Sequence, residues 1–252
     1  MTIVEAKEKL KKEGYTAFEL SDFDNGLYNF FEKFKCNEQT NLKEICTTLR
    51  VDTTDSQLYR HRAELISHEA AVEKKNELLK LIEKEKLNLI FGQSKDKFDI
   101  MQIWYYADLS KILPQYNYIT KETNKDYYYL KNRIKNMMTY FFDFEETQDF
   151  VFFSPTFTYY DTGCVLKNHS DGTNTGRVCA LLIYLNEEYD ENDGGILILN
   201  DEEKVVPKFG KVAIIDLQSF DIKHQVTKVT GGIGRYAFLT FIKTIENQFI
   251  NY

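Results

Sequence analysis

The spacing of hydrophobic residues divides the chain into two halves with different periods. Between residues 56 and 90, apolar residues such as Leu65 and Val72 recur at spacings that predict one or two amphipathic helices. The run NKDYYYLKNRIKNMMTYFFD predicts another helix, whose aromatic residues we expect in the core. YTAFELSDF predicts a short strand that enters a helix capped by Ser21 or Asp22. The first 150 residues are therefore predicted to be mostly helical.

The second half changes to short runs rich in β-branched and aromatic residues. Nine of the twelve glycines follow residue 150, and turns such as ENDGG and TGGIG separate the runs. The expected strands are FVFFSPTFTYY, VCALLIYLN, GILILN, KVAIIDL, KHQVTKV and RYAFLTFIK. Six short strands with tight turns predict an antiparallel sandwich or barrel, with helices packed outside it in one domain.

Composition restricts the class of protein further. A chain of 252 residues with 43% hydrophobic content can bury one full core. The net charge of −7 argues against nucleic acid or an anionic membrane as the main partner. No apolar run approaches the ~20 residues of a membrane span, and MTIVEAKEKLKKEG lacks the apolar core of a signal peptide. We therefore expect a cytoplasmic protein. Its four cysteines match no metal-binding spacing, and we expect them to be reduced thiols.

The segment KNHSDGTNTGR places a histidine and a carboxylate one residue apart, at the edge of a predicted strand. His169 and Asp171 point to the same face if the strand continues through them. They form either a hydrogen-bonded loop pair or two metal ligands. His224 opens another predicted strand 55 residues later. Two histidines and one carboxylate on one face favour Fe(II) and oxygen chemistry, because the opposite face of the ion stays open.

Three more residues are candidates for a site beside that metal. Arg235 opens the last predicted strand, where its guanidinium can bind a carboxylate through two parallel hydrogen bonds. A cosubstrate that chelates iron and ends in a second carboxylate, as 2-oxoglutarate does, would span the gap. Tyr160 is a second donor to that carboxylate, although a one-residue change of register would substitute Tyr159. Arg177 either contacts substrate or cosubstrate, or pairs with an acidic neighbour.

His61 and His68 lie seven residues apart in the predicted helical region. On one helix they would share a face, which allows a second metal site. Solvated histidines on the surface of a helix are the commoner arrangement.

These segments resemble one known family between Tyr159 and about Lys243. YDTGCVLKNHSD, RVCALLIYLNEEYDENDGGILIL and HQVTKVTGGIGRYAFLTF resemble, in order, the motifs of the Fe(II)/2-oxoglutarate-dependent dioxygenases, in their prolyl 4-hydroxylase-like branch. Two departures stand out. Arg235 occupies a position where many members have lysine, and it follows His224 at a distance about one residue longer than usual.

The resemblance implies a fold that is mostly β with α. Its core would be a double-stranded β-helix, that is, a jelly-roll or cupin-like core, with packed N-terminal helices. We expect a helical N-terminal portion (1–150) that supports a dioxygenase core (151–252) within one integrated domain. In this arrangement His169, Asp171 and His224 hold the iron. Arg235, Tyr160 and Arg177 contact the cosubstrate.

The resemblance also implies the reaction. Fe(II) would be the metal, 2-oxoglutarate and O2 the cosubstrates, and ascorbate a candidate auxiliary reductant. The chain would hydroxylate an unactivated C–H bond and release succinate and CO2, and the carboxylate at Asp171 favours hydroxylation over halogenation. The substrate stays open between a prolyl or other residue of a protein or peptide, a free amino acid and a natural-product intermediate. The alternative class is an inactive protein that binds or senses metal or 2-oxoglutarate. The sequence carries no signal for the oligomeric state.

Overall fold

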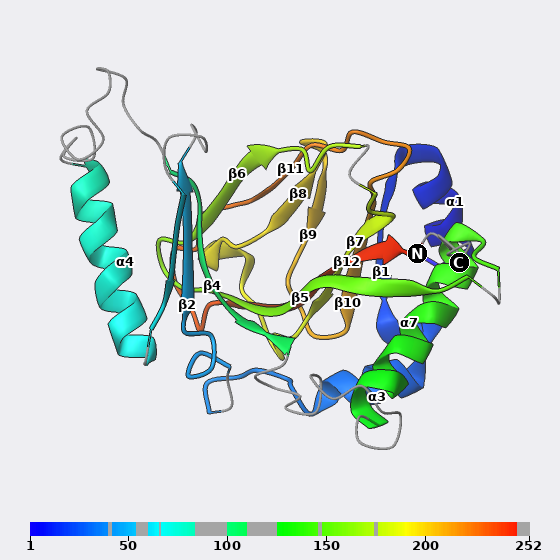
Figure 1. Cartoon of the computed structure of the whole chain (residues 1–252), viewed down its shortest axis with the longest axis horizontal. Coiled ribbons are helices and arrows are strands. Elements are labelled where there is room, and N and C mark those ends of the chain that lie inside the picture. Colours follow the sequence, from blue (N-terminus) through cyan, green and yellow to red (C-terminus); the bar gives the residue numbers. More distant parts are fainter. Residues whose placement is uncertain are drawn as a thin grey trace, which may run out of the picture.

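A nearly closed barrel of mostly antiparallel strands forms the centre of the molecule, with helices outside it (Figure 1). The computed structural model describes residues 1–39, 42–53, 60–65, 67–83, 100–109, 125–145, 148–173 and 176–245. The helices are α1 (Ile3–Glu13), α2 (Leu20–Phe23), α3 (Asn25–Glu32), α4 (His68–Glu83) and α7 (Lys125–Phe142), with a short 3-10 turn η2 (Glu191–Asp193). No helix among these residues is long and apolar enough to cross a membrane.

Strand β4 joins the two parts of the sheet. One part has the order β1-β10-β7-β12-β5-β4, and the other follows as β6-β11-β8-β9, while the β2–β3 hairpin pairs with β4. β4 pairs with β5 and also with β6, so it closes one side of the barrel. The strands are β1 (Tyr15–Glu19), β2 (Thr48–Thr53), β3 (Arg60–Glu64), β4 (Ile100–Asp108), β5 (Phe150–Tyr160), β6 (Val165–His169), β7 (Cys179–Tyr184), β8 (Leu197–Leu199), β9 (Glu203–Val205), β10 (Lys211–Asp216), β11 (His224–Val226) and β12 (Arg235–Thr244).

Helices α1, α3 and α7 lie together on one flank of the barrel, and α4 lies on the opposite flank (Figure 1). α1 begins with a capping box between Thr2 and Glu5 and ends at Gly14 in the left-handed conformation. Where the helical layer meets β1, the rings of Phe18 and Phe141 stack with centroids 5.0 Å apart. The six residues of β7 are all buried, because this layer covers one face of the sheet and the barrel interior lies on the other.

The predicted fold class is confirmed, and all six predicted strands are present as β5, β7, β8, β10, β11 and β12. The predictions for the helix over residues 125–142 and for the strand-to-helix run after Tyr15 are also confirmed. The cap prediction is wrong, because α2 follows Glu19 and has no side-chain cap. The cysteines are free and buried, as expected.

The expected description of residues 1–150 as a helical portion is incomplete. Residues 1–150 also supply β1 to β4, which complete the sheet around the core. Part of the predicted helical region 56–90 is strand β3, and α4 begins at His68. His61 therefore lies on a strand and His68 on a helix, so the shared helix face predicted for them is wrong. Residues 54–59 and 84–90 of that region lie outside the described residues.

A buried ion pair attaches α4 to the end of β5. Nζ of Lys75, a side chain only 4% exposed, lies 2.6 Å from Oδ1 of Asp161 and donates a second hydrogen bond to the carbonyl of Thr162. The hydroxyl of Tyr105 donates to the same carboxylate at 3.4 Å, and Sγ of Cys164 lies 3.1 Å from it. Since a buried carboxylate without its cation is costly, this pair determines how α4 docks.

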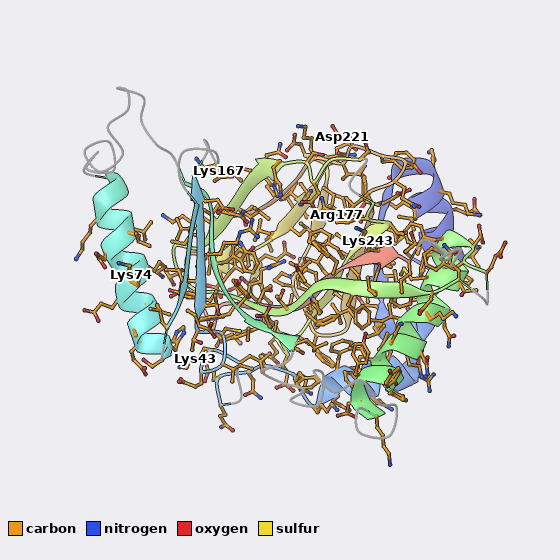
Figure 2. The ribbon with its side chains drawn as sticks, viewed as in Figure 1. Lys43, Lys74, Lys167, Arg177, Asp221 and Lys243 are labelled. Carbon is orange, nitrogen blue, oxygen red and sulfur yellow. The ribbon has the colours of Figure 1, made fainter. Side chains whose placement is uncertain are left out.

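We expect Lys75→Ala to lower the free energy of unfolding by about 2 kcal/mol, because it leaves the half-buried Asp161 without its cation. Lys74→Ala is the matched control. Lys74 lies on α4 at the edge of the molecule (Figure 2), and its partner Glu77 is exposed. That loss should stay under about 0.5 kcal/mol. Urea unfolding of both variants measures the difference, and equal losses would contradict a structural role for the buried pair.

Candidate active site

Two neighbouring strands bring three potential metal ligands together. His169 ends β6 and lies opposite His224, the first residue of β11, in an antiparallel pair. Asp171 follows two residues after His169, in the turn that Gly172 continues with φ +73°. One donor atom from each of the three side chains lies within 4.8 Å of the other two. The structure thus brings together His169, Asp171 and His224, which the sequence singled out.

Hydrogen bonds orient both imidazoles toward the same point. Nδ1 of His169 lies 2.9 Å from the carbonyl of Lys167, and Nδ1 of His224 lies 3.3 Å from the carbonyl of Ile222. A carbonyl only accepts, so Nδ1 carries a proton, and in the neutral ring the lone pair is then on Nε2. The Nε2 atoms of His169 and His224 lie 3.9 Å and 3.7 Å from the carboxylate oxygens of Asp171. Burial, together with the neighbouring His169, lowers the pKa of His224 and keeps it neutral.

Two further contacts hold the Asp171 turn. Nη2 of Arg177 donates to the backbone carbonyl of Asp171 at 2.7 Å, and its Nη1 lies 4.0 Å from the carboxylate. Ser170 donates its hydroxyl to Asp221, which precedes the second histidine strand. Figure 2 labels Asp221 at the upper edge of the barrel and Arg177 further in. Arg177 therefore lies beside an acidic neighbour, one of the two roles expected for it.

Arg235 is a buried cation with no counter-ion among the described residues. It is 2% exposed, and no described carboxylate forms an ion pair with it. Its Nη2 donates to the hydroxyl of Tyr184 at 3.3 Å, while its Nε is buried without a hydrogen-bond partner. The guanidinium carbon lies 4.8 Å from the ring of Tyr160 and 5.0 Å from the ring of Tyr184. A buried guanidinium that lacks a carboxylate is poised to bind an anion.

The turn before Arg235 is fixed by side-chain and backbone contacts. Asn186 is fully buried, donates to the carbonyl of Gly234 at 2.7 Å and accepts from the backbone N–H of Tyr236 at 2.8 Å. Gly234 has φ +88°, and a Cβ there would lie 2.6 Å from the carbonyl oxygen of Tyr160. Only glycine fits this position, which explains the last glycine of the TGGIG turn.

Strand register decides between the two neighbouring tyrosines. Arg235 lies opposite Tyr160 in the β12–β5 pair, so both side chains face the barrel interior. Tyr159 lies opposite Tyr236 on the other face, where the two rings stack 4.6 Å apart. Burial raises the pKa of Tyr160 and of Tyr184, so both hydroxyls stay protonated.

One cavity of about 730 Å³ connects the ligand cluster with the buried guanidinium. It is lined by all six residues that the sequence singled out, namely His169, Asp171, His224, Arg235, Tyr160 and Arg177. It is also lined by residues that sequence reasoning missed, among them Arg50, Asp52, Gln102, Trp104 and Asp108. Tyr184, the acceptor of the Arg235 hydrogen bond, was missed too. Tyr184 lies two residues after Leu182 in one strand, so the sequence does place the two side chains on the same face. Alternation alone does not say which face of the strand is inside the barrel.

Comparison with known proteins agrees with this geometry. Residues 155–243 match the family described as the 2OG-Fe(II) oxygenase superfamily. A prolyl-4-hydroxylase from Pseudomonas putida shares the fold with a TM-score of 0.52 and 12% identity, over 95% of this chain and 97% of that one. A prolyl hydroxylase from Trichoplax adhaerens, solved with a hypoxia inducible factor peptide fragment, has a TM-score of 0.50 and 14% identity, over 94% and 87%. A search of curated protein sequences finds no match.

The chain is therefore similar, over residues 155–243, to the 2OG-Fe(II) oxygenase superfamily. Its fold is that of the prolyl 4-hydroxylases.

We expect Arg235→Met to raise the free energy of unfolding by about 1 kcal/mol or more, because it removes a buried charge that no described carboxylate balances. Urea unfolding in the absence of any ligand measures this. Arg133→Met is the control, since Arg133 is more than a third exposed and pairs with Asp24. A less stable Arg235→Met protein would show that the cation is already balanced in the folded chain.

Proposed function

We propose that the chain is an Fe(II)- and 2-oxoglutarate-dependent dioxygenase that hydroxylates an unactivated C–H bond. One C–H bond, one O2 and one 2-oxoglutarate would give one C–OH, one succinate and one CO2. One observation carries the proposal. A two-histidine, one-carboxylate cluster and a buried guanidinium without a carboxylate line the same cavity.

The donor set suits ferrous iron. His169 and His224 offer Nε2 atoms and Asp171 offers an oxygen, and one donor atom of each lies within 4.8 Å of the others. Neutral imidazole and carboxylate ligands with open positions are typical of non-haem Fe(II) oxygenases. The carbonyls that accept from both Nδ1 atoms keep the rings in place when the metal is absent.

The other end of the cavity suits the far carboxylate of 2-oxoglutarate. Arg235 supplies the charge and unused N–H donors, including the orphaned Nε. Tyr184 accepts one bond from Arg235, which leaves its own proton free to donate. Tyr160 lies beside the same guanidinium. These groups are mostly buried, so their hydrogen bonds to an anion form without competition from water.

When bound, ferrous iron and 2-oxoglutarate would activate O2, which supplies the oxygen inserted into the C–H bond. The chain's residues supply position. The register of β11 against β6 fixes the two imidazoles, Arg177 holds the Asp171 turn, and Arg235 sets the direction of the cosubstrate. Ascorbate as an auxiliary reductant and a cytoplasmic location stay predictions, as does the boundary near residue 150.

The proposed class of substrate is supported by the fold alone. The Trichoplax adhaerens neighbour is a prolyl hydroxylase that was solved with a peptide fragment bound. A residue within a protein or peptide is therefore the first substrate class to test, with free amino acids second. The alternative, a protein that binds 2-oxoglutarate without turnover, is an outcome of the next test.

We expect the purified protein to form succinate from 2-oxoglutarate with Fe(II) and ascorbate, and His169→Ala and His224→Ala to lose that activity. His68→Phe is the matched control. His68 is buried between Tyr105 and Tyr159, away from the cluster, and phenylalanine keeps the ring packing. Succinate measured by mass spectrometry checks this. Equal rates in the wild type and both alanine variants would rule out the assigned ligands.

We also expect a weak visible absorption band when Fe(II) and 2-oxoglutarate are added under anaerobic conditions. Arg235→Met should raise the 2-oxoglutarate concentration that half-saturates this band by at least about tenfold, because charged hydrogen bonds are lost. Arg133→Met should leave it unchanged. The readout needs no substrate, so binding without turnover appears as a band with no succinate. The absence of a band in the wild type would contradict the cosubstrate assignment.

A further inference from the structure

The N-terminal half of the chain builds a second wall of the cavity. Arg50 and Asp52 on β2 lie opposite Trp104 and Gln102 on β4. Alternation along β4 then puts Tyr106 and Asp108 on the same face as Trp104. Arg50, Asp52, Gln102, Trp104, Tyr106 and Asp108 all line the cavity. This β2–β4 wall faces the same space as the metal cluster, and it lies outside the matched region 155–243.

When the charged residues that line the cavity are matched with their partners, one carboxylate remains without a partner among the described residues. Arg50 donates from Nε and Nη2 to Asp52 at 3.0 Å and 2.8 Å, so these two charges offset each other. Asp171 belongs to the ligand cluster, and Arg177 lies beside it. Arg235 is assigned to the cosubstrate by the proposed function. Asp108 remains, and among the described residues it forms no hydrogen bond or ion pair.

Asp108 follows the aromatic residues Trp104 and Tyr106 on one face of β4. Asp108 lies opposite Thr156 on β5, and Tyr106 lies opposite Thr158. The rings of Trp104 and Tyr106 are 5.4 Å apart. Phe153, also on β5, lines the cavity and is 49% exposed. A carboxylate at the end of an aromatic wall suits an organic cation, because the ring faces and the carboxylate both attract positive charge.

The barrel already uses its rings in this way. A guanidinium carbon lies 5.7 Å from the ring of Trp104, 4.4 Å from the ring of Phe241 and 4.8 Å from the ring of Tyr160. Three cations of the chain, Arg50, Arg177 and Arg235, thus lie over aromatic rings of the cavity. The cavity is also lined by small or aliphatic side chains, namely Thr156, Ala180, Leu182 and Leu239. Such a lining suits an alkyl chain inside the cavity.

We propose that the substrate carries an ammonium or guanidinium group on an aliphatic chain, and that Asp108 binds this group while the chain runs toward the metal cluster. This inference rests on the proposed function. An anionic group at this place would face the Asp108 carboxylate, and an apolar group would strip it of water without a partner. The same side-chain chemistry belongs to free lysine or arginine and to a lysyl or arginyl residue in a peptide.

The test measures how much each compound stimulates succinate formation above the substrate-free rate of the same protein. The compounds are lysine, arginine, leucine and glutamate, each as the free amino acid and within a short capped peptide. We expect stimulation by the lysine and arginine compounds and none by leucine or glutamate. The free or the peptide form that stimulates identifies the source of the cation.

Variants at Asp108 test whether this carboxylate causes the preference for cationic compounds. Asp108→Asn should raise the KM for the cationic compound at least about tenfold, and Asp108→Glu should restore most of the loss. Asp108→Lys should make the glutamate compound stimulate, a gain that misfolding cannot imitate. Asp22→Asn, an exposed carboxylate outside the cavity, should leave the KM unchanged.

Three outcomes would overturn the inference: no stimulation by any cationic compound, equal stimulation by leucine or glutamate, or an unchanged KM in Asp108→Asn. The absorption band and the substrate-free succinate rate are measured in the same samples. If the wild type lacks them, the proposed function itself fails. If they are present without a preference for cations, only the role of Asp108 fails.

Discussion

The pairing of β11 with β6 is the constraint on which the candidate active site depends. β11 is only three residues long, and it lies between β6 and β8, with His224 opposite His169 on one side and Leu199 on the other. A shift of one residue would present Gln225 in place of His224 and turn the imidazole to the other face. The carbonyls of Lys167 and Ile222, each two residues before a histidine, orient the rings locally. The backbone thus prepares the site before any metal arrives.

The second constraint is a charge that the fold leaves unbalanced among the described residues. Burying Arg235 costs free energy, and the contacts that surround it offset only part of that cost, since two rings and one hydroxyl are weaker partners than a carboxylate. Asn186 and Gly234 nevertheless hold the turn that puts it there. Ordinary core packing would favour an apolar residue at this position. The arrangement makes sense for a protein whose folded state is completed by an anion, because a bound ligand repays the cost through binding.

The sequence predicted the C-terminal core well because its signals are local. Most strands from β5 to β12 show a compact apolar run bounded by turns, although β6, which ends in His169, reads VLKNH and was not predicted. The His-x-Asp spacing nevertheless places two candidate ligands close together in the chain. The choice of Tyr160 over Tyr159 needed the pairing with Arg235, which is a contact across 75 positions of the chain. Alternation gives two faces but does not say which one is inside. The family resemblance supplied that information for the ligands and not for Tyr184.

The N-terminal half was harder to predict because its strands do not form a pattern by themselves. β3 reads RHRAE, with almost no apolar residue, since it pairs only with β2 at the edge of the sheet. β4 is rich in aromatic residues, yet both of its faces carry them, so the period of two is obscured. Its role depends on partners far along the chain, because it closes the barrel between β5 and β6. Propensity over a short window cannot see such a partner.

Strand β4 both closes the barrel and lines the cavity. Different positions along the strand serve these two roles. The middle of the strand, where both neighbours pair, carries rings that are nearly fully buried, such as Trp104 and Tyr106. Asp108 is the last residue of the strand and is exposed. A charge in the middle would have to be desolvated to close the barrel, whereas a charge at the end keeps its water until a ligand replaces it. On β4 itself, closure therefore leaves the strand end as the place for an unpaired charge, and Asp108 is the residue found there.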